Sequence, residues 1–151
     1  MKTIRLQNKF LVLFLSFWIA GACSLSAFAE KNAKPLKYTK EDLQILSAII
    51  YAEAGNEPTK GQLAVAQVVV NRMLSKKYPN TIKAVVKQKG QFSVVKNGKI
   101  PTKTSEKSTA NAVAVLKGQR VFSNNVFYFS GKAQRGKKVW GRIGNHVFCY
   151  G

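Results

Sequence analysis

The segment from Ile49 to Arg72 constrains the fold and the chemistry of this chain more than any other. It reads IIYAEAGNEPTKGQLAVAQVVVNR and places two carboxylates, Glu53 and Glu57, between two strongly apolar runs. The whole chain has six acidic residues, and two of them lie here, four positions apart. A carboxylate beside a buried helix costs free energy unless it is paired or used in chemistry. The segment therefore predicts two packed helices with a paired or functional carboxylate at their junction.

The first 29 residues are typical of a secretory signal peptide. Basic residues precede an apolar run from Phe10 to Ala22, which is short for a membrane span, and Ala27-Phe28-Ala29 is a small-x-small cleavage sequence. We predict cleavage after Ala29. An uncleaved anchor and a lipoprotein attached through Cys23 are the alternatives. The predicted organisation is a signal peptide at 1–29, a flexible lead-in at 30–38 and one functional domain at 39–151.

Cleavage would leave 122 residues, which is long enough for one domain with its own core. These residues would carry 22 basic and six acidic side chains, a net charge of +16. A secreted protein this basic is expected to concentrate on an anionic polymer, such as bacterial wall material or nucleic acid. Cys149 would have no partner for an internal disulfide, and its aromatic neighbours predict a buried strand residue.

Capping signals define the two helices of the opening segment. Thr39 and Asp42 form a predicted capping box, and Gly55 is a natural helix end. Glu53 then falls in the last turn, where the helix dipole and burial both favour its protonated form, as a general acid requires. For the second helix we predict Thr59 as the cap with Gln62 at the capping-box position. At its end, Asn71 and Arg72 are expected either to pair with the preceding acids or to be solvated.

The rest of the chain changes character after Gly118. Before it, the sequence predicts a short helix at 81–87, a loop with an Asn97-Gly98 turn, and a longer helix capped by Ser105. After it, aromatic and β-branched runs predict strands at 126–129, 139–140 and 146–150. The predicted class is a mostly helical α+β domain, with a small antiparallel sheet from the C-terminal third whose loops face the helical part.

The residue inventory argues against most catalytic classes. A catalytic zinc site commonly needs three protein ligands, mostly His, and His146 is the single histidine. A Ser-His-Asp site would need Asp42, which the capping box already uses. No Gly-rich phosphate loop follows a strand. We therefore expect no metal and no cofactor, and carboxylate chemistry remains.

Glu53 and Glu57 do not suit the usual pair of glycosidase carboxylates. Four positions apart on one helix puts their Cβ atoms about 6 Å from each other. Both would then lie on the same side of a substrate, whereas paired glycosidase carboxylates flank the bond that they cleave. A mechanism with one essential Glu, acting first as acid and then as base toward an oxygen of the sugar itself, fits better.

Several separated motifs, in order, resemble the SleB/CwlJ family of spore-cortex and cell-wall hydrolases. They are YAEAGNEPTKGQLAVAQVVVNR, YPNTIKAVV, GQFSVVKNGKI, VFYFSGKA and IGNHVF, which together cover roughly Leu43 to Tyr150. The resemblance implies a lysozyme-like or lytic-transglycosylase-like domain that cleaves the peptidoglycan strand between N-acetylmuramic acid and N-acetylglucosamine. It implies that Glu53, the first Glu of a Glu-Ala-x-Gly-Glu pattern, is the catalytic acid. The chain departs from the pattern at Gly55-Asn56 and at Phe129-Ser130-Gly131.

The other candidates are assigned supporting or substrate-binding roles. We expect Glu57 to pair with Arg72 or Lys60, and His146 to make a structural hydrogen bond. The complete supporting set is Glu57, Gln62, Asn71, Arg72, Gln91, Phe92, Tyr128 and His146.

Two functions stay open at this point. The first is a secreted enzyme of the cell wall or spore cortex, acting as a monomer in cortex lysis during germination or in wall remodelling. Its partners would be peptidoglycan glycan strands and a companion germination protein, with no nucleic acid and no stable membrane span after cleavage. The second is a non-catalytic basic protein that binds anionic wall polymer or nucleic acid. The sequence does not choose between hydrolase and transglycosylase, or between cortex and vegetative wall.

Overall fold

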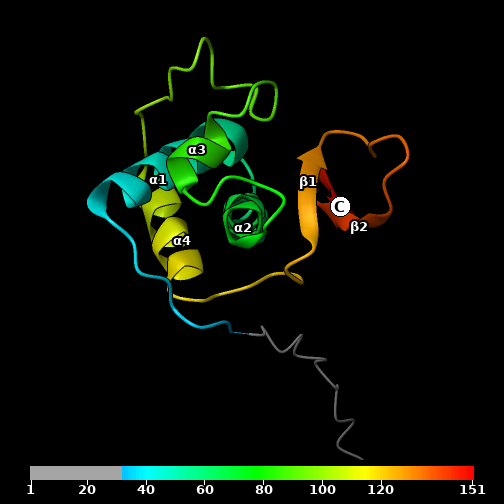
Figure 1. Ribbon diagram of the computed structural model, residues 1–151, viewed down its shortest axis with the longest axis horizontal. Helices are drawn as coiled ribbons and strands as arrows, with labels where there is room; N and C mark the ends of the chain where they lie inside the picture. The colour runs from blue at the N-terminus through cyan, green and yellow to red at the C-terminus, as the bar shows by residue number, and fades with distance from the viewer. Residues whose placement is uncertain (1–31) are drawn as a thin grey trace, which may run out of the picture.

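The computed structural model describes residues 32–151, so the predicted signal peptide and Cys23 lie outside the described residues. Within this part, four helices precede one three-stranded sheet. Figure 1 shows α1, α3 and α4 on one side of α2 and the sheet on the other. The predicted mostly helical α+β class is confirmed. The elements are α1 Lys40–Ala54, α2 Thr59–Leu74, α3 Ile82–Val86, α4 Glu106–Leu116, β1 Val126–Ser130, β2 Val139–Ile143 and β3 His146–Tyr150.

The predicted starts of α1 and α4 are confirmed by their caps. Thr39 Oγ1 accepts a hydrogen bond from the Asp42 amide at 3.1 Å, and the Asp42 carboxylate accepts from the Thr39 amide at 3.0 Å. Ser105 caps α4 through the same reciprocal arrangement. At the other end of α1, a Cβ added to Gly55 would lie 2.5 Å from the carbonyl oxygen of Tyr51. The close approach of this carbonyl, rather than a left-handed backbone, is what requires glycine there.

The predicted capping box at the start of α2 is wrong. Thr59 is already the first helical residue, Pro58 precedes it as the cap, and no side chain bonds to the free amides. Gln62 is buried and turns elsewhere: its Nε2 donates to the Gly55 carbonyl at 3.2 Å, and its Oε1 accepts from Asn111 of α4 at 2.9 Å. Proline suits this position because its fixed φ is compatible with the helix start.

The sheet is antiparallel with strand order β1-β3-β2, so the last strand lies in the middle. The second strand continues to Ile143, three residues beyond the predicted end at Trp140, because the turn to β3 is confined to Gly144 and Asn145. This turn faces the helical part, as predicted. The loop that joins β1 to β2 instead projects from the sheet away from α2 (Figure 1).

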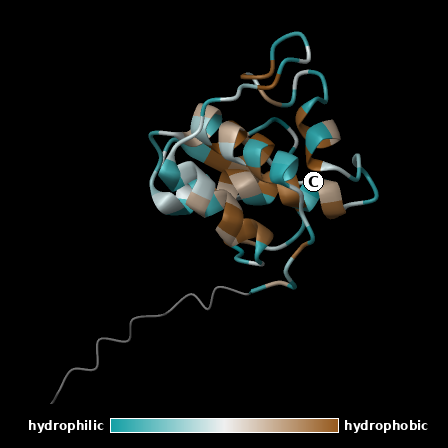
Figure 2. Cartoon of the chain, turned by 90° about the vertical axis from the view of Figure 1, so that its left-hand side faces the viewer, coloured by the Kyte–Doolittle hydropathy of each residue, from teal (hydrophilic) through white to brown (hydrophobic). Residues whose placement is uncertain are grey.

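The core has two parts that meet on α2. Every residue of α2 from Gly61 to Arg72 is buried, and α2 contacts α1, α3, α4 and β1. One cluster lies among the helices and the other lies between α2 and the sheet around Phe148. Hydrophobic residues accordingly gather inside the helical part, whereas the surrounding loops are mainly hydrophilic (Figure 2). Within residues 32–151, no helix combines the length and the apolarity that a membrane crossing needs.

The predicted lead-in makes contacts that the sequence did not indicate. Residues 32–39 have no regular secondary structure. However, the amides of Ala33 and Leu36 donate to the carbonyls of Gly118 and Leu116 at 2.7 and 2.9 Å. Gly118 has φ of 110°, and a Cβ there would meet the Ala33 carbonyl. This segment is therefore held along the end of α4. Cys149, as predicted, is a buried strand residue with a free thiol.

Candidate active site

Glu53 lies in the last turn of α1, two residues before the chain leaves the helix at Gly55. Its side chain is half-buried. The hydroxyl of Ser93, on the loop between α3 and α4, donates to Glu53 Oε1 at 3.4 Å. One carboxylate oxygen of Glu53 thus contacts the loop between α3 and α4, and the side chain remains partly exposed to solvent.

Glu57 is in a different environment, although it is only four residues away. Its side chain is 6% exposed. Asn145 donates to the carboxylate twice, from its backbone amide at 3.2 Å to Oε2 and from its Nδ2 at 2.9 Å to Oε1. Gly144 has φ of 55°, and a Cβ added there would collide with Glu57 Oε2. Glu57 therefore holds the turn between β2 and β3 against the start of α2.

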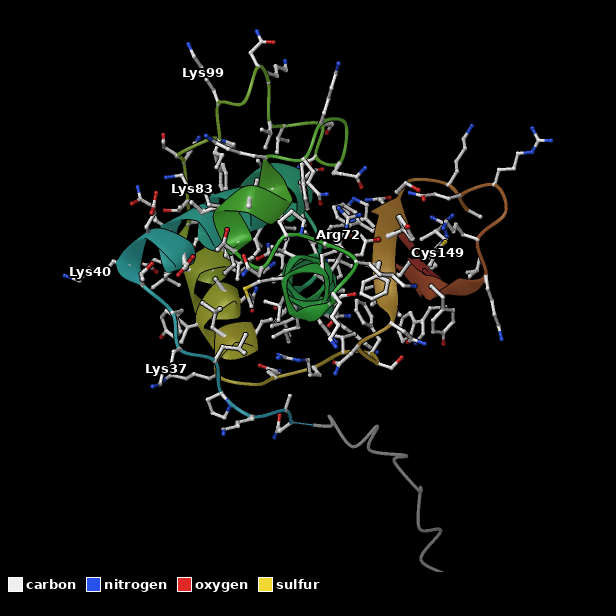
Figure 3. All side chains as sticks on the ribbon, viewed as in Figure 1. Lys37, Lys40, Arg72, Lys83, Lys99 and Cys149 are labelled. Atoms are coloured by element: carbon white, nitrogen blue, oxygen red, sulfur yellow. The ribbon has the colours of Figure 1, made fainter. Side chains whose placement is uncertain are left out.

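The predicted pairing of Glu57 with Arg72 is wrong, because Arg72 lies near the other end of α2. Its side chain is 3% exposed, and its Nε donates to the Phe127 carbonyl at 2.8 Å. Figure 3 shows Arg72 between α2 and β1. Burial lowers the pKa of the guanidinium. Its Cζ lies 5.4–5.6 Å from the ring centres of three aromatic residues, Tyr78, Phe92 and Tyr128.

Asn71 also faces β1 and not the acids. Its Nδ2 donates to the carbonyls of Ser123 and Val126 at 3.1 and 2.9 Å. The expectation of acid pairing or of a solvated helix end is therefore wrong. The helix continues to Leu74, so Asn71 lies inside it and its side chain satisfies the chain that enters β1.

The two tyrosines near Arg72 are joined by their hydroxyls. Tyr78 donates to the hydroxyl of Tyr128 at 3.1 Å. Burial, followed by this donated bond, raises the pKa of Tyr78 to about 12. Accepting the bond lowers the pKa of Tyr128, and the charge of Lys137, whose Nζ lies 4.5 Å from the Tyr128 ring centre, acts in the same direction. The donor and the acceptor thus differ in acidity although both are phenols.

The loop candidates Gln91 and Phe92 separate in the structure. Gln91 is exposed, whereas Phe92 is 2% exposed and its ring packs 6.1 Å from that of Phe129. Phe92 is therefore a buried packing residue that does not meet solvent. His146 packs edge-on against Phe129 with ring centres 5.2 Å apart. Its Nδ1 is buried and has no hydrogen-bond partner among the described residues.

The remaining acids of residues 32–151 are in structural positions. Glu41 pairs with Lys83 at 2.6 Å, and Asp42 belongs to the capping box of α1. Glu106 is exposed in the first turn of α4, where the positive end of the helix dipole favours it. The described residues contain no group of three His, Cys, Asp or Glu side chains that could hold a metal ion. Among these acids, Glu53 is the half-exposed carboxylate that takes part in neither an ion pair nor a helix cap.

Two surface cavities lie on another part of α1. They measure about 300 and 330 Å³, share Gln44 and Thr102, and are lined by α1, α3, the 98–104 segment and Thr109. Neither includes Glu53. The site around Glu53 is therefore described through its side-chain contacts.

Sequence reasoning did not single out Ser93, Asn145 or Tyr78. Ser93 and Asn145 contact the two carboxylates, and Tyr78 contacts both Arg72 and Tyr128. A signal for them existed, because all three lie in segments that carry the family resemblance: YPNTIKAVV, GQFSVVKNGKI and IGNHVF. Local patterns could not assign their hydrogen-bond partners, which are 40–88 positions away along the chain.

Fold and site together define a small α+β domain built around one half-exposed carboxylate. A family model described as Cell Wall Hydrolase matches residues 56–149, more than half of the chain. This chain therefore belongs to the cell wall hydrolase family, and the predicted resemblance is confirmed. It is 33% identical over 123 residues to the spore cortex-lytic enzyme of Bacillus cereus and 29% identical over 120 residues to that of Bacillus subtilis. Each alignment covers 76% of this chain, and the chain spans 46% and 39% of these relatives.

Solved structures give the same assignment. The catalytic domain of the Bacillus cereus SleB protein superposes with a TM-score of 0.68 at 28% identity, covering 77% of this chain and 94% of that one. The catalytic domain of the germination-specific lytic transglycosylase SleB from Bacillus anthracis has a TM-score of 0.68 at 29% identity, covering 76% and 98%. The described domain thus matches nearly the whole of these catalytic domains, although it spans less than half of the full-length relatives.

Proposed function

We propose that the domain at 39–151 cleaves the glycan strand of peptidoglycan between N-acetylmuramic acid and N-acetylglucosamine, with Glu53 as its single catalytic carboxylate. The observation that carries this proposal is the difference between the two acids. Both oxygens of Glu57 accept hydrogen bonds from Asn145, so Glu57 is not free to attack a sugar or to activate water. Glu53 is half-exposed, and within residues 32–151 its carboxylate accepts one long hydrogen bond, from Ser93.

One carboxylate is sufficient for a lytic transglycosylase. Glu53 donates a proton to the glycosidic oxygen, so that the bond to the muramic acid C1 breaks and the leaving sugar departs as an alcohol. The resulting carboxylate then takes the proton from the C6 hydroxyl of the same muramic acid, whose oxygen bonds to C1 and closes a 1,6-anhydro ring. Glu53 finishes protonated, as it began. If water supplies the oxygen instead, the product is a reducing end and the enzyme is a hydrolase.

The names of the relatives support a proposal for the setting of the reaction. Their names place them in spore cortex lysis, and we propose that this chain acts there during germination, with remodelling of the vegetative wall as the second setting. Export through a signal peptide at 1–29, action as a monomer and a companion germination protein belong to the same proposal. The non-catalytic binding protein is not favoured, since the matched structures are catalytic domains.

The test is Glu53→Gln, with Glu106→Gln as its matched control. Both variants remove one carboxylate, but Glu106 is exposed in the first turn of α4 and outside the site. Each is incubated with purified cortex and with vegetative sacculi, and released muropeptides are analysed by mass. Glu53→Gln should lose about 10²–10⁴-fold in turnover, the usual contribution of general acid–base catalysis. Glu106→Gln should keep normal turnover.

The products decide the reaction type, and the activity decides the proposal. Anhydro-muramic ends identify a transglycosylase and reducing ends a hydrolase. A folded Glu53→Gln protein that retains near-normal turnover would show that the single-carboxylate assignment is wrong.

A further inference from the structure

Net positive charge is concentrated toward the end of this chain, because all six acidic residues precede residue 107. Residues 107–151 contain eight Lys or Arg and no Asp or Glu. Four of these cations fall within the loop at 131–138 that joins β1 to β2, which we call the basic loop. They are Lys132, Arg135, Lys137 and Lys138, and all are exposed. Because no acid interrupts them, the basic loop creates a local positive potential that attracts anions.

The basic loop lies next to the residues that surround the candidate site. It begins two residues after Phe129, whose ring contacts both Phe92 and His146. Near its end, the side chain of Lys137 lies against the edge strand β1, with its Nζ 4.5 Å from the ring centre of Tyr128. A lysine held over an aromatic face is positioned by that ring, which an isolated solvated lysine is not.

Packed side chains connect the basic loop to Glu53. The Tyr128 ring lies 5.6 Å from Arg72 Cζ, and the Phe92 ring lies 5.5 Å from the same atom. The residue after Phe92 is Ser93, which donates to Glu53. A polymer bound at Glu53 is therefore within a few side chains of the basic loop.

The local potential already acts on a protein group at this edge of the sheet. The pKa of the Tyr128 hydroxyl is lowered, first by the hydrogen bond that it accepts from Tyr78 and further by the charges of Lys137 and Arg72. An oxygen that becomes negative is thus stabilised beside Lys137. The same environment suits the anionic oxygen of a ligand.

We propose that the basic loop binds the free carboxylates of the peptide stems carried by the peptidoglycan strand that Glu53 cuts. This inference rests on the proposed function. Each stem hangs from a muramic acid, so a strand placed at Glu53 brings stem carboxylates to the neighbouring surface. Teichoic-acid phosphates carry similar charge, but they are not attached next to the bond that is cut. Adjacency to the site therefore favours the stems.

The experiment compares two fourfold Lys/Arg→Gln variants that lose the same charge. The loop variant changes Lys132, Arg135, Lys137 and Lys138. The control variant changes four other exposed lysines: Lys34, Lys37, Lys40 and Lys99. Figure 3 shows Lys37, Lys40 and Lys99 on the helical side of the molecule. Binding is measured in a Glu53→Gln background, which stops turnover, and turnover is measured with Glu53 present.

Three substrates separate the sources of charge. They are teichoic-free sacculi with stems, the same sacculi after an amidase has removed the stems, and sacculi that retain teichoic acid. On teichoic-free sacculi the loop variant should bind about tenfold more weakly, because exposed charge pairs each contribute little but four act together. The control should lose less than about twofold. On stem-free glycan all three proteins should bind alike.

Each other outcome overturns the inference. Equal losses in the loop and control variants would mean that net charge alone attracts the wall. A loss confined to sacculi with teichoic acid would assign the loop to phosphate. No loss on any substrate would leave the loop without this role. Failure of the proposed function is visible separately, as absence of cleavage by the protein that carries Glu53.

Discussion

Replacement of Glu57 tests whether this acid is structural or chemical. The structure makes it an anchor: the buried carboxylate accepts two hydrogen bonds from Asn145 and so holds the turn between β2 and β3 against α2. It also lies just before the start of α2, at the positive end of the helix dipole. Glu57→Ala removes both contributions without adding a clash.

The expected loss of stability can be estimated from these contacts. Hydrogen bonds to a charged group contribute about 1.5–3 kcal/mol. We count one such contribution and not two, because Asn145 is exposed and its donor groups can form hydrogen bonds with water once the carboxylate is removed. The helix dipole adds about 0.3–1 kcal/mol. Glu57→Ala should therefore lower the free energy of unfolding by about 2–4 kcal/mol, and Glu57→Gln, which keeps one acceptor oxygen, by about half as much.

Urea denaturation followed by circular dichroism measures these differences. Glu106→Gln is the matched control, since it removes an exposed acid from the first turn of α4 and should cost less than about 1 kcal/mol. A double-mutant cycle with Asn145→Ala should give a coupling energy of about 0.5–3 kcal/mol, as expected for residues in contact. A Glu57→Ala protein as stable as the unsubstituted one would refute the anchor. A stable Glu57→Gln protein as inactive as Glu53→Gln would show that Glu57 takes part in the chemistry.

Three further predictions concern Arg72 and the two tyrosines beside it. Arg72→Lys removes the planar guanidinium that contacts three aromatic rings, and it removes the Nε hydrogen bond to the Phe127 carbonyl. It should therefore lower the free energy of unfolding, measured by urea denaturation, by about 1–3 kcal/mol. An unchanged denaturation midpoint would contradict this role for Arg72. The pKa of Tyr78 is raised from 10.0 to about 12, so its contribution to stability is complete below pH 10 and is lost as the pH rises toward 12. Tyr128→Phe removes the accepting hydroxyl and should lower the Tyr78 pKa in an ultraviolet titration, though not to 10.0, because burial is the larger cause.

Much of the fold could be predicted because its signals are local. The predicted capping box at Thr39 and the predicted cap at Ser105 both formed, because each needs only side chains three residues apart. The strands follow from aromatic and β-branched runs, and their bounds differ from prediction by at most three residues. The start of α2 was mispredicted because Thr59 resembles a cap, while Pro58 occupies that position.

The partners of the site residues could not be predicted, because they are fixed by tertiary packing. Nothing near Glu57 in the sequence indicates that Asn145, 88 positions away, would donate hydrogen bonds to both carboxylate oxygens of Glu57. The need for glycine at position 144 is likewise not visible in the sequence, because it arises from the Glu57 carboxylate that packs beside it. The prediction of Glu53 came from the residue pattern and the family resemblance, and its catalytic role remains a prediction.

Buried polar side chains along α2 explain how one helix positions both halves of the site. Gln62 bonds to the end of α1 and to α4, Gln67 to the backbone at Phe122, and Asn71 and Arg72 to the chain at the start of β1. An apolar residue at any of these positions would leave a buried backbone or side-chain group without its partner. The sheet is thus held by directed bonds from the same helix that packs against α1. Since Glu53 is on α1 and the basic loop is on the sheet, α2 sets the distance between the proposed acid and the proposed carboxylate-binding surface.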